Sequence, residues 1–373
     1  MNIIKNRMLT AAFTLSGSII GAGILGLPYV FAQSGYAIGL FWIIFLGLVV
    51  GYTFLCLGEV CLRTKETHQL PGYAEKYLGK FGKIIMLLSV IFGSYAALLA
   101  YLVGESQSIS IIVTNSDNAM LYSALGFWLF MSFLLKEGMR NLKKIETIGV
   151  LIVIFLITFI YIIYSPEIKY QNLNDISWNY FFIPFGVVLF ALLGFNAIPE
   201  IKILLKNKEK VMKKVILIGI SIPIILYIIF SLIFVGVFGN NVSQIATLSS
   251  GKLITLLGIF TMMTSYFILS FSLKDVFTYD LHFPKKTSYT LVSVIPLALY
   301  LGLFFLDKIN FTQIIGIGGV ISGGLTGILI MMMNLSAKKN GNRKPEYSMQ
   351  VPWYLFTLLT IVYLFGVVIQ IFF

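Results

Sequence analysis

Long runs of apolar residues, separated by short polar segments, make up most of this chain. A helix needs about 20 predominantly apolar residues to cross the hydrocarbon core of a bilayer. Strands of a membrane barrel would instead form segments of about ten residues with alternating polarity, and the runs lack this alternation. The pattern therefore predicts an all-α integral membrane protein. Eleven spans are expected, at residues 8–31, 36–61, 83–113, 119–136, 144–164, 180–204, 213–239, 251–274, 287–306, 310–334 and 351–373.

Composition agrees with a chain that lies mostly in lipid. Hydrophobic residues make up 58% of the 373 residues and charged residues only 11%, against about 25% charged residues in a typical soluble domain. The abundance of large apolar residues excludes a disordered protein, and a total of two cysteines excludes a disulfide-based scaffold. The first apolar run has full spanning length, contains Pro28 and lacks a small-residue cleavage site. We therefore expect it to remain as a membrane helix and not to be removed as a signal peptide.

The basic residues are distributed unevenly between the two sides of the predicted spans. With the N-terminus inside, 24 of the 27 Lys and Arg residues fall in inner loops, and only Lys169, Lys252 and Lys308 fall outside. Inner loops of membrane proteins are enriched in basic residues. We therefore expect a multi-pass protein of the cell membrane with a cytoplasmic N-terminus and an extracellular C-terminus. The same distribution explains the net charge of +12 without a nucleic acid as partner.

The sequence gives no support for enzymatic chemistry. It has no phosphate-binding loop. Its two histidines, His68 and His282, are far apart and lack the clustered carboxylates or thiols that a metal site would need. We predict that the protein is not an enzyme, has no cofactor and does not use ATP directly.

Two predicted spans contain residues that oppose a continuous helix. Residues 17–28 hold four glycines and a proline, and residues 190–199 hold Gly194 and Pro199. Within a helix, each glycine costs about 1 kcal/mol relative to alanine, and a proline costs about 3 kcal/mol. At 1.5 Å per residue, both interruptions lie roughly 15–24 Å into the membrane. We expect both helices to be broken near the midplane.

The two interrupted spans, the first and the sixth, enter the membrane from opposite sides. They occupy corresponding positions if residues 8–165 and 178–334 form two halves of an inverted repeat, with residues 351–373 as an extra helix. Paired interruptions of this kind are typical of the central site of a transporter, because unwound backbone at this depth must line a cavity or be buried in protein. The alternative is that the glycines only allow close packing between helices.

Several segments are similar to a known transporter family. Residues 17–28 (GSIIGAGILGLP) resemble the first-helix signature of the amino acid–polyamine–organocation (APC) superfamily, more narrowly of its amino acid/auxin permease and hydroxy/aromatic amino acid permease branches. Residues 193–199 resemble the broken sixth helix, with Asn196 where the aromatic branch commonly has histidine. Residues 264–281 resemble the eighth helix, and residues 71–80 look like the loop before the third. The similarity covers nearly the whole chain.

The resemblance implies one transmembrane transporter domain over residues 1–373. Its fold would be LeuT-type: five plus five helices in inverted repeat, with helices 1 and 6 broken, plus one extra helix. The resemblance also implies secondary transport of an amino acid by alternating access. The alternative is an amino-acid-sensing membrane receptor on the same fold. Apart from Glu105, no buried charged side chain is expected opposite the broken helices, so we predict a neutral substrate, aromatic amino acids included.

An α-amino acid carries a carboxylate and an ammonium, and a broken helix offers groups for both. The free N–H groups that begin its second half suit a carboxylate, and the free C=O groups that end its first half suit an ammonium. Tyr101 could add a hydroxyl, and the resemblance places Phe190 as a lid. The Ser18 hydroxyl either joins the site or bonds to its own helix. The amides are assigned to Gly21, Ala22 and Gly23, and the carbonyls to Ser18, Ile19, Phe190, Ala191 and Leu193, around the break at Gly194.

Transport is expected to be coupled to Na⁺ or H⁺. In the eighth span, Thr264 and Ser265 lie at the depth where the first span is interrupted, and the pair resembles the sodium site of the wider LeuT-type fold. These hydroxyls could instead bond within their own helix. The alternative coupling ion is a proton on Glu105, near the outer interface, since the aromatic branch is generally regarded as proton-coupled. The sodium ligands would be the carbonyls of Gly17, Ile20 and Thr261 with the hydroxyls of Thr264 and Ser265, which matches the hard oxygens that such cations prefer.

Overall fold

The computed structural model describes residues 7–137 and 142–372 of the chain. Within this part, all regular elements are helices and none is a strand, so the prediction of an all-α protein is confirmed. Nine of the described helices are long and apolar enough to cross a membrane, or up to ten spans if the bent pair α1–α2 counts as one. The chain is a multi-pass membrane protein.

The helices are α1 (Arg7–Ile19), α2 (Gly23–Ser34), α3 (Tyr36–Leu62), α4 (Leu70–Thr114), α5 (Met120–Glu137), α6 (Leu142–Tyr164), α7 (Gln171–Asn174), α8 (Pro184–Ala191), α9 (Ala197–Leu204), α10 (Met212–Phe238), α11 (Lys252–Asp275), α12 (Lys285–Phe305), α13 (Phe311–Gly318), α14 (Gly324–Asn340) and α15 (Trp353–Phe372).

Each predicted span corresponds to one helix or to a pair of shorter helices. The sixth is divided into α8 and α9, of eight residues each, which are too short to cross a bilayer alone. A count of eleven spans therefore requires that α8 and α9 cross together. The tenth consists of α13 and α14, joined by π-helical turns at Gly319–Gly323. Phe373, the last residue of the eleventh predicted span, lies outside the described residues.

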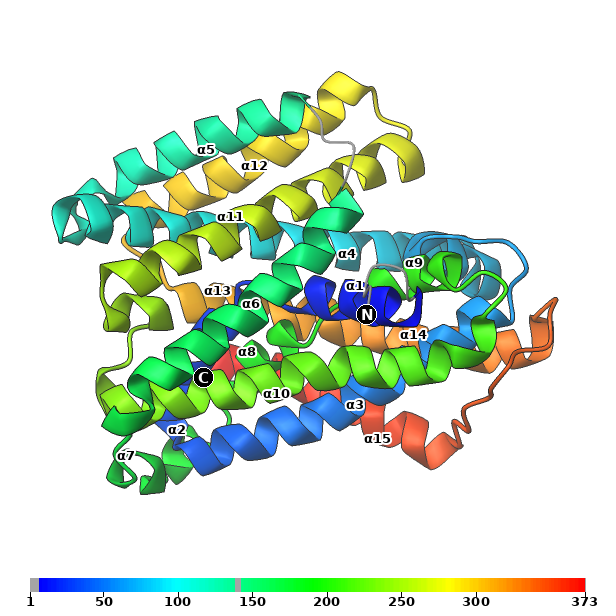
Figure 1. Cartoon of the computed structure of the whole chain (residues 1–373). Coiled ribbons are helices and arrows are strands. Elements are labelled where there is room, and N and C mark those ends of the chain that lie inside the picture. Colours follow the sequence, from blue (N-terminus) through cyan, green and yellow to red (C-terminus); the bar gives the residue numbers. More distant parts are fainter. Residues whose placement is uncertain (1–6, 138–141, 373) are drawn as a thin grey trace.

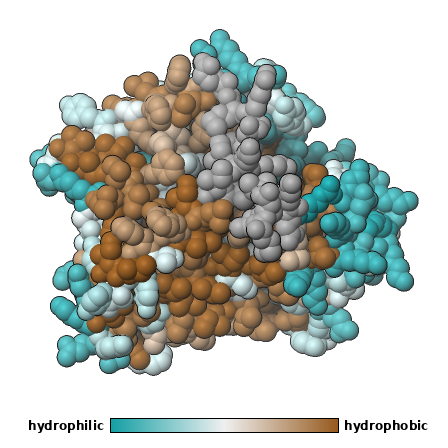
Figure 2. Space-filling view, in the orientation of Figure 1, coloured by the Kyte–Doolittle hydropathy of each residue, from teal (hydrophilic) through white to brown (hydrophobic). Residues whose placement is uncertain are grey.

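The long helices lie roughly parallel and form two groups around the broken ones (Figure 1). Helices α4, α5, α11 and α12 pack against one another on one side, and α3 and α10 run together on the other. The broken helices lie near the middle of the bundle. Helices α2 and α9 contact both α3 and α10, α1 contacts α9 and α10, and α8 contacts α2 and α3. Apolar residues cover the middle of the surface, and hydrophilic residues gather toward the ends of the helices (Figure 2). This distribution is the one expected of a bundle surrounded by lipid.

The segment before the third span differs from its expected structure. Residues 71–80 were expected to form a loop, but α4 begins at Leu70 and includes them. Pro71 suits the first turn of a helix, where its missing N–H needs no partner. The helix bends at Gly79, whose φ of 75° lies in the left-handed region that glycine adopts without strain. The prediction of a loop was therefore wrong, and the segment is a short helix that continues into the span through a kink.

The C-terminal end of α3 is fixed by a network around Glu59. The Glu59 carboxylate is fully buried and accepts hydrogen bonds from Arg63 Nε at 2.8 Å and Asn334 Nδ2 at 3.0 Å. It also accepts bonds from Ser348 Oγ at 2.8 Å and the Met349 N–H at 2.7 Å. A buried carboxylate is tolerated only when it is paired and hydrogen-bonded in this way. The network joins α3 and α14 to the segment before α15.

Candidate functional site: two helix breaks in contact

The first span is broken where the sequence predicts it. Helices α1 and α2 are bent by 58° relative to each other. Ile20 is the last residue whose N–H continues the first helix, and it bonds to the Ser16 carbonyl at 2.9 Å. The next three N–H groups, of Gly21, Ala22 and Gly23, have no backbone acceptor among the described residues. These three amides were assigned to a substrate carboxylate, and the Ala22 N–H is already bonded to the hydroxyl of Tyr101.

The sixth predicted span is also interrupted, between the end of α8 at Ala191 and the start of α9 at Ala197. The Leu193 N–H bonds to the Phe190 carbonyl at 3.1 Å, and the Ala197 N–H bonds to the Gly194 carbonyl at 3.1 Å. The Phe190 carbonyl, one of those assigned to an ammonium, is therefore already engaged in a turn. The Leu193 carbonyl has no backbone donor in the described part of the chain.

The two breaks lie directly against each other. A Cβ atom added to Gly23 would lie 2.5 Å from Cα of Ala191, and one added to Gly194 would lie 2.5 Å from Cγ1 of Ile19. Real Cβ atoms do not approach other atoms so closely, so glycine is required at both positions for this contact. The glycines thus serve both purposes considered from the sequence, since they interrupt the helices and allow close packing.

Tyr101 of α4, a candidate for the substrate site, lies at the first break. Its hydroxyl accepts a hydrogen bond from the Ala22 N–H at 3.2 Å, and a Cβ atom added to Gly21 would lie 2.4 Å from the same hydroxyl. The hydroxyl also interacts with the side chain of Ser265 in α11. Spans one, three and eight therefore meet at an amide that was assigned to the substrate carboxylate.

Tyr227 of α10 joins the two breaks and was missed from the sequence. Its hydroxyl is fully buried and donates to the Ile19 carbonyl at 3.0 Å and the Ala191 carbonyl at 2.9 Å. Both carbonyls were assigned to an ammonium. The sequence did indicate that its hydroxyl is buried, because Tyr227 lies 14 residues after Lys213, or about 21 Å into the seventh predicted span. A hydroxyl at that depth needs a partner within the protein.

Two further predicted residues are held by packing around the breaks. The Ser18 hydroxyl donates to the Leu15 carbonyl of its own helix at 2.9 Å, which is the alternative considered for it. Phe190 packs against the tenth span, where a Cβ atom on Gly318 would lie 3.4 Å from its ring and one on Gly319 would lie 2.8 Å from its Cβ. The ring therefore fills the space between the sixth and tenth spans.

Of the groups of α11 assigned to sodium, the Thr261 carbonyl and the Thr264 hydroxyl are bonded to each other within the helix. Thr261 Oγ1 donates to the Leu257 carbonyl at 2.9 Å. Thr264 Oγ1 donates to the Phe260 carbonyl at 3.2 Å and the Thr261 carbonyl at 2.9 Å. A hydroxyl that donates its proton keeps its oxygen lone pairs for a further partner. Ser265 is placed at the first break through its interaction with Tyr101.

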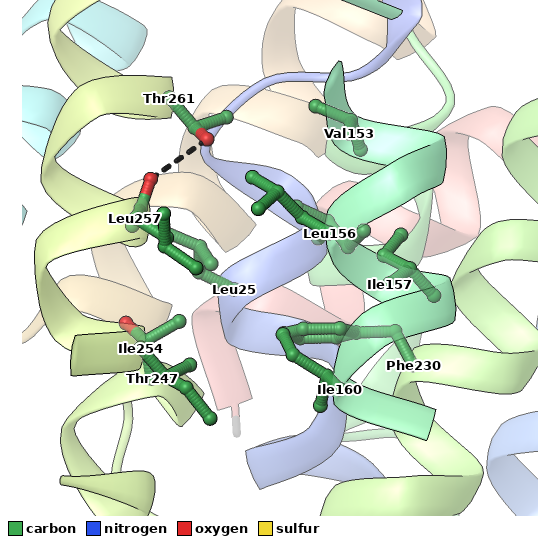
Figure 3. Close-up of a pocket in the computed structure, with 12 residues that line it drawn as sticks. Leu25, Val153, Leu156, Ile157, Ile160, Phe230, Thr247, Ile254, Leu257 and Thr261 are labelled. Atoms are coloured by element: carbon green, nitrogen blue, oxygen red, sulfur yellow. Dashed lines mark hydrogen bonds between the residues drawn. The ribbon is translucent and has the colours of Figure 1, made fainter. Parts of the chain in front are cut away.

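An apolar cavity begins immediately beyond the first break (Figure 3). It lies between α2, α6, α10 and α11, and Figure 3 shows the Thr261 hydroxyl bonded to the Leu257 carbonyl at its edge. Thr247 and Thr261 are its polar lining residues, and the others carry aliphatic or aromatic side chains or are glycine. The cavity adjoins the break without contributing charge to it.

Glu105 is buried more deeply than the sequence suggested. It lies one helical turn beyond Tyr101 on the same face of α4. The residue is 0% exposed, and neither carboxylate oxygen has a hydrogen-bond partner among the described residues. Ser108, at the next turn, is also buried with an unpartnered hydroxyl. We expected Glu105 near the outer interface, where water would solvate it, but the surrounding helices enclose it.

The chain matches the Tryptophan/tyrosine permease family over residues 4–373. Glutamine transporter 2 of Aliivibrio fischeri is 24% identical over 372 residues, which cover 92% of this chain and 93% of that protein. Tyrosine-specific transport system 1 of Haemophilus influenzae is 25% identical over 238 residues, covering 63% of this chain and 59% of that protein. Amino acid transporter AVT3A of Arabidopsis thaliana is 20% identical over 285 residues, covering 70% and 65%. These relatives are named as transporters and not as enzymes.

Proposed function

The chain belongs to the tryptophan/tyrosine permease family, and from this premise we propose that it is a secondary active transporter of a neutral amino acid, aromatic ones included. It would work by alternating access and be driven by a Na⁺ or H⁺ gradient. The family and the relatives are permeases and amino acid transporters, so the chain is not an enzyme. Transport is also favoured over the sensing receptor, because the relatives above carry transporter names.

We propose a LeuT-type fold of eleven spans for this transporter. Its halves would be residues 8–165 and 178–334, with α15 as the extra helix. Helix packing supports the inverted repeat, since α3 packs along α10, α4 along α11 and α5 along α12. Each of these pairs joins helices at the same place in the two halves. The broken pairs α1–α2 and α8–α9 complete the correspondence.

The observation that carries the proposal is the contact between the two breaks. The first break brings together the amides of Gly21, Ala22 and Gly23, of which that of Ala22 is bonded to the Tyr101 hydroxyl. Beside them, α1 and α8 end in the carbonyls of Ile19 and Ala191, which accept from the Tyr227 hydroxyl. Free amides at a helix N-terminus attract a carboxylate, and C-terminal carbonyls attract a cation. The set is complementary to the charged groups that all α-amino acids share. Side-chain selectivity would come from the surrounding apolar residues.

Two sets of residues are proposed to bind the coupling cation. The Thr264 and Ser265 hydroxyls, with the carbonyls of Gly17, Ile20 and Thr261, would supply five oxygens for Na⁺. Glu105 would supply the proton site, because an ionised carboxylate without partners is costly in an apolar environment and a neutral acid is not. Replacing both hydroxyls (Thr264→Ala with Ser265→Ala) should lower sodium-driven uptake at subsaturating Na⁺. Uptake by the double variant with unchanged sodium dependence would reject this sodium site.

Uptake by the purified protein in proteoliposomes tests the transport function. Labelled L-tyrosine and L-glutamine are offered separately under an inward Na⁺ gradient, an inward H⁺ gradient or neither. We expect concentrative uptake of at least one of them under one gradient. Excess unlabelled substrate should abolish the signal, whereas L-arginine and L-glutamate should not. Binding without uptake under either gradient would favour a receptor instead, and displacement by arginine or glutamate alone would contradict a neutral substrate.

Cysteine labelling tests the proposed orientation. Asn340 at the end of α14 and Asn174 in α7 are both exposed, and the native Cys56 and Cys61 are fully buried. An impermeant maleimide added to intact cells should label Asn174→Cys but not Asn340→Cys. Lysis should make Asn340→Cys reactive. The reverse pattern would place the N-terminus outside.

A further inference from the structure

The two carbonyls held by Tyr227 are the last of their helices. Ile19 ends α1 and Ala191 ends α8. The final carbonyls of a helix accept no hydrogen bond from an N–H of the same helix, and they carry the partial negative charge of its C-terminus. The Tyr227 hydroxyl lies 3.0 and 2.9 Å from them. A hydroxyl has one proton to donate, so this proton is shared between the two breaks.

Tyr227 reaches the breaks from a helix that is itself fixed to α1. Pro223, one turn earlier in α10, has no N–H and leaves the Gly219 carbonyl without its helical donor. The Ser16 hydroxyl of α1 donates to that carbonyl at 2.9 Å. A Cβ atom on Gly219 would lie 2.7 Å from the Leu15 side chain, so the two helices are in close contact. These contacts fix α10 to α1. The Tyr227 side chain is therefore held in position, and its hydroxyl reaches both α1 and α8.

We propose that the Tyr227 hydroxyl stands in for the substrate ammonium at these two carbonyls whenever the carrier closes without substrate. The inference rests on the transport function proposed above and extends it to the return step of the empty carrier. An ammonium has three donors and can satisfy both carbonyls, but the contact between Gly23 and Ala191 must first open to admit it. When the amino acid leaves, the breaks close again and the hydroxyl of Tyr227 takes its place.

The energetic reason is the cost of buried carbonyls without a donor. A buried polar group that loses its partner is penalised far more than a group that exchanges one partner for another. In the loaded carrier the ammonium supplies the donor, with or without Tyr227. In the empty, closed carrier Tyr227 supplies it to both Ile19 and Ala191. Removal of the hydroxyl should therefore destabilise the empty closed carrier and leave the loaded carrier almost unchanged.

The test is to compare net uptake with exchange in the variant Tyr227→Phe. Net uptake requires the empty carrier to return, whereas exchange of labelled for unlabelled amino acid does not. The probe is L-tyrosine or L-glutamine, whichever wild type accumulates. We expect net uptake to fall about tenfold, as for the loss of a buried hydrogen-bond donor, with exchange within about twofold of wild type on the same reasoning. Equilibrium binding should become several-fold tighter, because the empty carrier is the destabilised species.

Tyr300→Phe is the matched control. Tyr300 is also fully buried, and its hydroxyl donates to the Met120 carbonyl at 3.3 Å, between α12 and the start of α5. This variant loses a bond of the same kind away from the breaks, so its ratio of net uptake to exchange should equal that of wild type. The ratio does not depend on the amount of folded protein, so partial misfolding leaves the comparison intact.

Three results would overturn the role of Tyr227. The first is an unchanged ratio of net uptake to exchange in Tyr227→Phe, whether or not both activities fall in parallel. The second is weaker binding and the third is complete loss of exchange, since either would make Tyr227 a ligand of the loaded carrier or a structural residue. Failure of wild type to accumulate either amino acid would count against the transport function itself, and so the two failures are distinguishable.

Discussion

The contact between the breaks can be tested by adding one methyl group to it. In Gly23→Ala, the new Cβ would lie 2.5 Å from Cα and 2.6 Å from Cβ of Ala191, about 1 Å inside normal carbon–carbon contact. Overpacking of this kind costs typically about 1–3 kcal/mol, against a gain of up to about 1 kcal/mol from replacing glycine with alanine in a helix. A net cost of about 1–2 kcal/mol would reduce the population of closed breaks roughly 5- to 30-fold.

The measurements are net uptake into proteoliposomes and thermal unfolding in detergent. Gly23→Ala should slow net uptake by about the same 5- to 30-fold factor and lower the unfolding temperature. Gly302→Ala in α12 is the matched control, because nothing lies within 4 Å of a Cβ added there. The control should transport as wild type does and be equally or slightly more stable, since it gains helix propensity without a clash.

A specific result would refute this reasoning. If Gly23→Ala transports at the wild-type rate and unfolds at the wild-type temperature, α2 and α8 do not approach as closely as the structure places them. The glycines of the first span would then serve only to interrupt the helix. If Gly302→Ala is equally impaired, the loss reflects the substitution of glycine in general and not the contact with Ala191.

Two further predictions concern pH. If uptake follows an inward H⁺ gradient, Glu105→Gln should remove that dependence, because the amide cannot carry a proton, and a variant still driven by the gradient would exclude Glu105 as the carrier. In the loop after α3, the hydrogen bond from Lys76 lowers the pKa of Glu66 to about 2. Because the pKa is lowered on folding, this bond stabilises the folded protein fully above the ordinary pKa of about 4.3, and the stabilisation is lost as pH falls toward 2. The difference in unfolding temperature between wild type and Glu66→Gln should be constant above pH 5 and shrink below it, and a difference that persists at pH 2 would contradict the assignment.

The breaks themselves could be predicted because their causes are local. Gly21 and Gly194 lie in the interruptions themselves, whereas Pro28 lies inside α2 and Pro199 in the first turn of α9. The depth of both interruptions follows from counting residues. The role of Tyr227 could not be predicted in the same way. Its acceptors lie 208 and 36 residues away along the chain, so the contact depends on how α10 packs against α1 and α8. The sequence shows only that a hydroxyl at that depth needs some partner.

The burial of Glu105 was missed because depth alone does not determine solvation. Counting residues from Lys83 places Glu105 toward the outer side of the third span, where water is available to an exposed side chain. Whether the side chain is exposed depends on its neighbours, and α4 is enclosed by α11, α12 and α13. The adjacent Gly104 would meet Met262 of α11 at 2.6 Å if it carried a Cβ. This packing is a property of the assembled bundle and leaves no local pattern.

Glycine packing and helix interruption, which were alternatives at the level of sequence, depend on each other in the folded protein. Interrupted backbone at the midplane must be satisfied by the protein itself, and the Tyr227 hydroxyl can satisfy both breaks only while Gly23 lets α8 approach α2. Gly23→Ala should therefore already weaken the bond from Tyr227 to the Ala191 carbonyl. We expect the double variant with Tyr227→Phe to lose less net uptake than the product of the two single losses, with a coupling of about 0.5–3 kcal/mol. Losses that simply multiply would mean that the methyl group and the hydroxyl act on separate steps, and the breaks would then not close as one unit.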